Sequence, residues 1–176
     1  TATAMFFESI VTPSGTFSTP ISLFGTPFYY GKGSLTLLPD GRALFVCIRN
    51  ADNYPVEYIR DVDGTWSAQN VISTEYSRSP SIVTLNDGRV LLTYISSNYI
   101  AERIRETDGT WGNRRNIVHL TNTNINISLF KLSNGKVLLL YFRDSDGFLV
   151  ERIRDLDGTW SEEEAISDGV DTGIPT

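Results

Sequence analysis

The sequence predicts an all-β fold made of repeated four-stranded units. Two internal repeats and the lack of any capped helical pattern support this prediction. Segments 35–44, 82–91 and 129–138 share a pattern of strand, tight turn and strand, and their turn glycines are spaced 47 residues apart. A spacing that recurs without change indicates duplication of one structural unit.

A second repeat follows the first in each unit. Segments 57–66, 102–111 and 151–160 each run from a glutamate to a tryptophan nine positions later, and segment 8–17 is a degenerate first copy that ends in phenylalanine. Each unit of about 47 residues therefore contributes two hairpins. Four-stranded units with this period predict the blades of a β-propeller, present here in part.

The elements follow from local chemistry. The first turns are Asp-Gly at 40–41, Asp-Gly at 87–88 and Asn-Gly at 134–135, dipeptides that accept the positive φ of a tight hairpin turn. The strands after them, 43–48, 90–95 and 137–142, are rich in Val, Leu, Tyr and Phe. Their nearly continuous apolarity predicts strands covered on both faces.

The repeat register divides the chain. We expect a half blade at 6–23, three blades at 33–72, 80–118 and 127–166, and the start of a further blade at 167–176. Closed propellers use about 4 to 8 blades, so we expect the remaining blades to come from a longer chain or from an oligomer. The sequence starts at Thr1 without an initiator methionine, which suggests a processed or excised piece.

Composition excludes several functions. The net charge of −6 and the pI of about 4.7 argue against duplex DNA or an anionic membrane surface as the main partner. The longest apolar run, 137–142, is far too short for membrane insertion, which needs about 20 residues. The single Cys47 and single His119 exclude an internal disulfide and a histidine-cluster metal site, and no cofactor motif is present, so we expect no metal or cofactor.

Residues that recur once per unit favour a structural role, because chemistry requires one asymmetric site. This applies to the glutamates at 57, 102 and 151 and to the arginines at 60, 105 and 154. We expect them to form salt bridges between or within blades. As surface pairs, these would each contribute roughly 0 to 1 kcal/mol to the free energy of unfolding.

Function is expected where the copies differ. The connections between the second and third strands, and between successive units, vary in length, whereas both hairpin turns are constant. In an antiparallel meander these variable connections share one edge. Their tyrosines and arginines suit a sugar surface, with rings on C–H faces and polar groups on hydroxyls, although ordinary loop composition is the alternative. The candidate substrate-binding residues are Arg49, Tyr54, Tyr76, Arg78, Tyr99 and Arg143.

The second repeat resembles the Asp-box, or BNR, motif of the sialidase-like β-propellers, approximately Ser-x-Asp-x-Gly-x-Thr-Trp. The resemblance covers nearly the whole chain. The residues at its acidic and indole positions are Asp61, Trp66, Glu106, Trp111, Asp155 and Trp160. It implies that these six residues stabilise turns and strand edges.

The same resemblance implies a carboxylate-gripping arginine in an Arg-x-Pro element, which Arg78-Ser79-Pro80 matches. It also implies a second arginine followed by an acidic catalytic residue. Arg49 with Asp52, and Arg143 with Asp144 or Asp146, have these residue types in the neighbouring units, so Asp52 and Asp144 are the catalytic candidates.

Two functions from different classes follow. The first is recognition of a carbohydrate ligand, sialylated or otherwise acidic, either by itself or as part of an exo-acting glycoside hydrolase. The second is a non-catalytic structural or protein-interaction module of a surface or virion assembly. The resemblance alone suggests an extracellular or surface location.

Overall fold

The computed structural model describes residues 7–11, 13–22, 28–123, 125–143 and 145–166, with side chains omitted for 28–32. These residues contain only β-structure, which confirms the predicted all-β class. The strands are β1 (Phe7–Glu8), β2 (Ile21–Ser22), β3 (Phe28–Leu37), β4 (Ala43–Arg49), β5 (Pro55–Arg60), β6 (Asn70–Val71), β7 (Arg78–Thr84), β8 (Val90–Ser96), β9 (Tyr99–Arg105), β10 (Arg115–His119), β11 (Ile127–Lys131), β12 (Val137–Phe142), β13 (Leu149–Arg154) and β14 (Glu164–Ala165).

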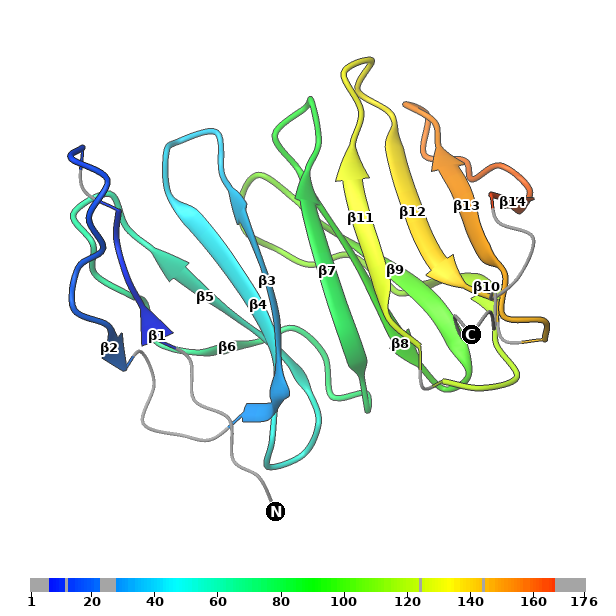
Figure 1. The fold of residues 1–176 in the computed structure, drawn as a ribbon, viewed down its shortest axis with the longest axis horizontal. Helices are drawn as coiled ribbons and strands as arrows, with labels where there is room; N and C mark the ends of the chain where they lie inside the picture. The colour runs from blue at the N-terminus through cyan, green and yellow to red at the C-terminus, as the bar shows by residue number, and fades with distance from the viewer. Residues whose placement is uncertain (1–6, 12, 23–27, 124, 144, 167–176) are drawn as a thin grey trace, which may run out of the picture.

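Twelve of these strands form three four-stranded antiparallel sheets, each a simple meander in chain order. Sheet I contains β3 to β6, sheet II contains β7 to β10, and sheet III contains β11 to β14. β1 and β2 form a separate two-stranded ribbon beside sheet I (Figure 1). The predicted starting blade at 167–176 lies outside the described residues.

The first turn of each sheet has the predicted geometry. Gly41, Gly88 and Gly135 adopt φ values of 86°, 86° and 85°, a region that side-chain-bearing residues rarely occupy. In each turn the carboxylate or amide before the glycine accepts the backbone N–H two residues on, as Asp40 Oδ1 does from Arg42 N at 3.0 Å. These local bonds fix the hairpin register before any packing between sheets.

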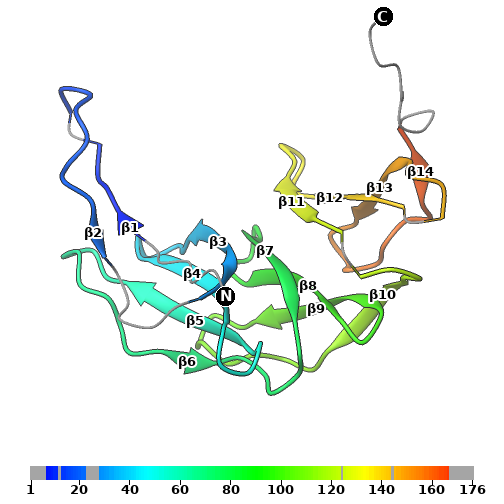
Figure 2. The same cartoon turned by 60° about the horizontal axis from the view of Figure 1, so that its bottom comes forward.

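The three sheets stand side by side in an arc, with β3, β7 and β11 on its inner side (Figure 2). Neighbouring inner strands are joined by the same bond in each case. The Ile82 amide donates to Ser34 Oγ at 3.1 Å, and the Leu129 amide donates to Ser81 Oγ at 3.0 Å. A serine on each inner strand therefore sets the register of the following sheet.

Apolar layers fill the two interfaces between sheets. Leu44 and Val46 of sheet I pack with Leu92 and Tyr94 of sheet II, and all four are fully buried. A second layer joins Ile95 and its neighbours in sheet II to sheet III. Because both faces of the middle sheet are covered, β8 is buried along its whole length, as its continuous apolar sequence predicts.

A buried carboxylate joins each sheet to the next. Glu57 on β5 accepts bonds from two groups of sheet II, Arg105 Nε at 2.9 Å and Trp111 Nε1 at 3.1 Å. Its other oxygen accepts from Asn70 Nδ2 at 2.8 Å. We call this arrangement of glutamate, arginine and tryptophan the inter-sheet lock.

The lock repeats at the other interfaces. Glu102 accepts from Arg154 Nε at 3.3 Å and from Trp160 Nε1 at 2.9 Å, and Glu8 of the ribbon bonds to the corresponding groups of sheet I. The expectation of surface pairs is wrong for Glu57 and Glu102, which are each 4% exposed. Neighbouring sheets cover them, and burial raises the cost of breaking the pair.

We predict that Glu102→Gln destabilises the chain far more than loss of a surface pair. The variant leaves the buried Arg154 guanidinium without its counter-charge, and removing one partner of a buried pair costs about 3–5 kcal/mol. Lys136→Gln, which removes an exposed pair with Asp155, is the control and should cost under about 1 kcal/mol. Urea unfolding measures both, and equal losses would contradict the lock.

We also predict that stability falls in acid. Bonds from the backbone N–H and hydroxyl of the threonine two residues on hold the pKa values of Asp63, Asp108 and Asp157 below the ordinary 3.8. A lowered folded pKa means that this stabilisation is present above pH 3.8 and is lost as pH falls through the folded value. The triple Asp→Asn variant should show a shallower fall in melting temperature below pH 4. Identical acid profiles for variant and wild type would disprove this.

Candidate functional site

The variable connections lie together along one edge of the arc, the lower edge in Figure 1, opposite the constant hairpin turns. Backbone bonds join neighbouring connections there. The Ser77 amide donates to Asn53 O at 2.9 Å, and the Leu120 amide donates to Asn98 O at 2.7 Å. Ser79 Oγ donates to Ile125 O at 3.0 Å, which ties the start of sheet II to the start of sheet III. The edge is therefore a connected surface.

Two of the predicted arginines are neutralised within their own turns. Arg49 Nε donates to Asp52 Oδ1 at 3.1 Å, and its guanidinium lies 5.9 Å from the centre of the Tyr54 ring. Arg143 Nη2 donates to Asp146 Oδ2 at 2.6 Å and lies 5.4 Å from the Phe148 ring. The two turns share the sequence Arg-x-x-Asp-x-aromatic, so the structure repeats this motif in sheets I and III.

The acidic partners in these turns have lowered pKa values. The hydrogen bond from Arg49 holds the pKa of Asp52 below its ordinary value, and Arg143 does the same for Asp146. A general acid requires a raised pKa, so both carboxylates are suited to fixing a turn and unsuited to protonating a leaving group. Asp144, the other catalytic candidate, lies outside the described residues.

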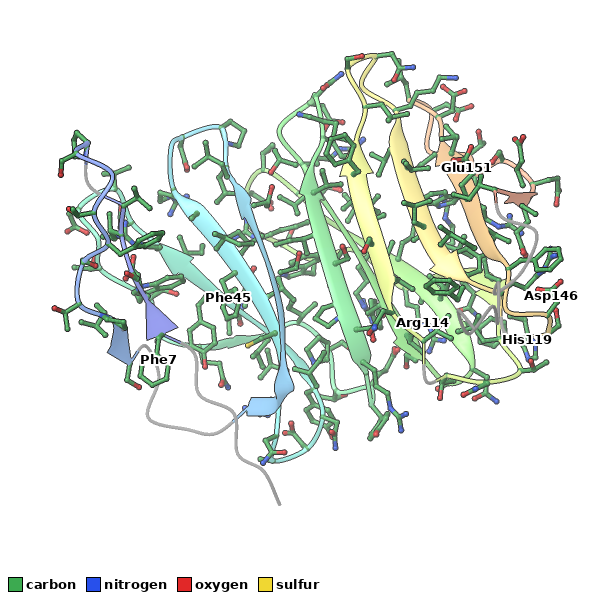
Figure 3. The ribbon with its side chains drawn as sticks, in the orientation of Figure 1. Phe7, Phe45, Arg114, His119, Asp146 and Glu151 are labelled. Atoms are coloured by element: carbon green, nitrogen blue, oxygen red, sulfur yellow. The ribbon has the colours of Figure 1, made fainter. Side chains whose placement is uncertain are left out.

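Sheet II has a shorter connection at the same place. Its turn residues Ser97 and Asn98 adopt φ values of 49° and 64°, so β8 passes directly into β9 without an arginine. Tyr99 packs edge-on against His119, with ring centres 5.0 Å apart, and Arg114 lies 5.9 Å from the Tyr99 ring. Arg114 comes from the connection after Trp111 and supplies the cation that the turn lacks. Figure 3 labels Arg114 and His119 near this edge.

Arg78 differs from every other arginine of the chain. Each of the other arginines forms an ion pair with a carboxylate, whereas no carboxylate of the described residues reaches Arg78. Its Nε and Nη2 donate to Tyr76 Oη at 3.0 and 2.7 Å. The tyrosine oxygen thus orients the guanidinium without neutralising it.

Arg78 and Tyr76 line a hollow between the start of sheet II and the connection to sheet III. We call it the Arg78 hollow; its volume is about 240 Å³. Its other walls carry Ser96, Ser97, Asn98 and Thr123. Ser96 is 2% exposed, and its Oγ has no hydrogen-bond partner. A buried hydroxyl of this kind is expected to find a partner.

A second hollow, of about 150 Å³, lies at the edge of sheet III. It brings Arg143 together with His119, Tyr141 and Glu163. Glu163 lies 3.6 Å from both Arg143 and Arg152, so the charges there are balanced. Burial raises the pKa of Tyr141 to about 12, so its hydroxyl stays protonated.

Sequence reasoning did not select Arg114, Glu75 and Glu163, which lie in the connections next to the last strand of a unit. Glu75 bonds to Arg114 Nη1 at 3.0 Å and lies 3.3 Å from Arg103 Nη2. A signal was present, since Arg114 and Glu163 both stand three residues after a tryptophan and carry opposite charge. Comparison of copies at that position would have marked it as variable.

The recurring acidic residues do not join either hollow. Asp61 Oδ1 accepts only the adjacent Val62 amide, at 2.8 Å, and Asp155 pairs with Lys136 at 2.9 Å. Glu106 lies 3.9 Å from Arg89. The carboxylates that close the second turns stand directly before the glycines, as Asp63 does by accepting from Thr65 N at 2.9 Å. Trp66, Trp111 and Trp160 donate to the lock glutamates.

The described residues bring no three metal-binding side chains together. Among the same residues no helix is long and apolar enough to cross a membrane.

Several solved structures have a similar fold. AofleA from Arthrobotrys oligospora matches with a TM-score of 0.72 at 17% identity, over 93% of this chain and 50% of that one. The Hadza microbial sialidase Hz136 matches with a TM-score of 0.61 at 16% identity, over 88% of this chain and 39% of that one.

An exo-β-1,3-galactanase from Phanerochaete chrysosporium, solved with galactose, matches with a TM-score of 0.57 at 13% identity, over 87% of this chain and 41% of that one. No protein-family model and no curated protein matches the sequence. The chain thus spans half or less of the length of these three structures. At such identities the likeness establishes the fold alone, a β-propeller in part.

Proposed function

We propose that the chain binds an acidic carbohydrate in the Arg78 hollow. The observation that carries the proposal is the unneutralised guanidinium of Arg78 on a surface where the other arginines are paired with carboxylates. In a chain with net charge −6, carboxylates outnumber cations, so an arginine without one is unusual. A ligand carboxylate would fill this place through the planar, two-pronged geometry of the guanidinium.

The rest of the hollow suits a sugar ring. Tyr76 Oη accepts both bonds from Arg78, which leaves its own proton directed elsewhere and available to a ligand hydroxyl. Asn98 and Thr123 also line the hollow and carry neutral polar side chains. One cation, an aromatic ring and several neutral polar groups are the components that a carboxylate-bearing sugar would use.

The geometry supports binding more strongly than glycoside cleavage. Cleavage requires two carboxyl groups that flank one bond, one of them with a raised pKa. The carboxylates of this edge, Asp52, Asp146, Glu75 and Glu163, are each paired with arginine. A sialidase-type reaction of a larger assembly therefore depends on groups beyond the described residues, and the proposal for this chain is recognition.

The alternative of a structural or protein-interaction module has its own supporting observation. The outer face of the ribbon exposes Phe7 and Phe17, by 59% and 73% of their surface. Exposed apolar side chains gathered at one end of a sheet array suit a protein partner. This face lies away from the hollow, so the two functions are compatible.

We predict that Arg78→Ala weakens binding of sialyllactose or a uronic acid oligosaccharide by about 10- to 100-fold, the effect of losing charge-assisted bonds worth about 1.5–3 kcal/mol. Arg78→Lys should restore only part of the affinity, because lysine lacks the planar fork. Titration calorimetry on the wild type and both variants measures this.

Arg49→Ala is the matched control, because Arg49 stands on the same edge and is already paired with Asp52. Its affinity should stay within about twofold of the wild type. Equal binding of lactose and sialyllactose, or an unchanged affinity in Arg78→Ala, would refute the role of Arg78. Hydrolysis of a fluorogenic sialoside by the wild-type chain would refute a binding-only function.

A further inference from the structure

One glutamate at a lock position, Glu151, has no hydrogen-bond donor among the described residues. Glu151 on β13 occupies the position in sheet III that Glu57 and Glu102 occupy in sheets I and II. Those two glutamates each bind an arginine and a tryptophan of the following sheet. No hydrogen bond or ion pair within the described residues reaches the Glu151 carboxylate. Figure 3 shows Glu151 on the last sheet of the row.

The charge around Glu151 is also uncompensated. Cross-strand neighbours support the other two glutamates: Asn70 bonds to Glu57, and Arg115 bonds to Glu102. The residue opposite Glu151 is Glu164. Like charges directly opposite on neighbouring strands destabilise a sheet. The open face of sheet III therefore presents two carboxylates where the earlier sheets have balanced charge.

The inner strand of sheet III is incomplete in the same way. Ser34 and Ser81 each accept the backbone amide of the next inner strand, and Ser128 stands at the third position of this series, 47 residues after Ser81. Ser128 is exposed. Two residues along, Phe130 is 65% exposed, whereas its counterpart Val83 packs between sheets II and III. β11 and β13 of sheet III thus both lack the partner groups that the equivalent strands of the earlier sheets find in the following sheet.

We propose that the outer face of sheet III docks a further four-stranded blade with an arginine and a tryptophan at the positions of Arg154 and Trp160. The guanidinium would neutralise Glu151 and the indole N–H would bond to its second acceptor site, as both do at Glu102. A backbone amide of the docked inner strand would bond to Ser128.

A second copy of this chain does not meet that requirement. Its free end is the ribbon, where the positions matching Arg154 and Trp160 are Val11 and Phe17. These are 54% and 73% exposed and carry neither a cation nor an N–H donor. Head-to-tail association would set Glu151 and Glu164 against apolar side chains, with both carboxylates desolvated and unpaired. The ribbon face instead fits a blade with an apolar residue at the glutamate position.

The first test uses the chain as it is. Glu151→Gln should leave the urea midpoint unchanged or raise it slightly, because it removes one of two facing charges, whereas Glu102→Gln should lower it. A loss in Glu151→Gln as large as that in Glu102→Gln would overturn the proposal. Sedimentation velocity provides the second measurement. A dimer that Glu151→Gln dissociates would identify a second copy as the occupant and would also overturn it.

The decisive experiment supplies the proposed blade. Trp111 precedes Ser128 by 17 residues, so a second copy of residues 128–166 placed directly after Thr176 keeps the same spacing from Trp160. The extended chain should have a higher urea midpoint than a matched version with Arg154→Ala and Trp160→Phe in the added copy. Glu151→Gln in the host should abolish the difference. Equal midpoints, or a difference that survives Glu151→Gln, would overturn the assignment.

Discussion

The fold depends on a carboxylate buried between neighbouring sheets. Glu57 and Glu102 each meet a guanidinium and an indole N–H from the following sheet, at distances of 2.9 to 3.3 Å. A buried ion pair contributes little net stability compared with apolar packing, but breaking it is costly. The lock therefore acts mainly on register, because only one relative position of two sheets pairs all three groups. Apolar layers supply the attraction between sheets, and the lock selects how they meet.

Away from the lock, a different residue occupies the same position in each of the three sheets, and each has its own polar partner. In sheet II, Arg103 and Arg114 share the carboxylate of Glu75, which comes from the preceding connection. In sheet III the residue at the position of Arg114 is Glu163, and it pairs with Arg152 in its own sheet. In sheet I that position is Gln69, which accepts a bond from Tyr58. An arginine, a glutamate and a glutamine thus occupy the equivalent position in the three sheets. Because each has a polar partner, residues at this edge can differ between sheets without leaving a buried charge unpaired.

The sequence predicted the parts of the structure that depend on local chemistry. Turn glycines, apolar strands and the 47-residue spacing specify the strand order and the hairpins, because each acts over a few residues. Burial of Glu57 could not be read in the same way, since it depends on how two sheets pack. Arg78 and Tyr76 were predicted as binding residues from the sequence and remain a prediction; that they share a hollow with Ser96 and Thr123 depends on contacts between separate connections, which the sequence does not show.

Repetition explains why the unpaired arginine is informative. At the interfaces between the described sheets, a repeated glutamate meets a repeated arginine and tryptophan, as the lock shows. Arg78 has no counterpart, since the matching residue before sheet III is Ile125. The bonds that hold Arg78 come from Tyr76, a neutral group. The same reasoning separates it from Arg49 and Arg143, which occur in matching turns with matching carboxylates. Arg78 thus departs both from the repeat and from the pairing of arginine with carboxylate that the other arginines show.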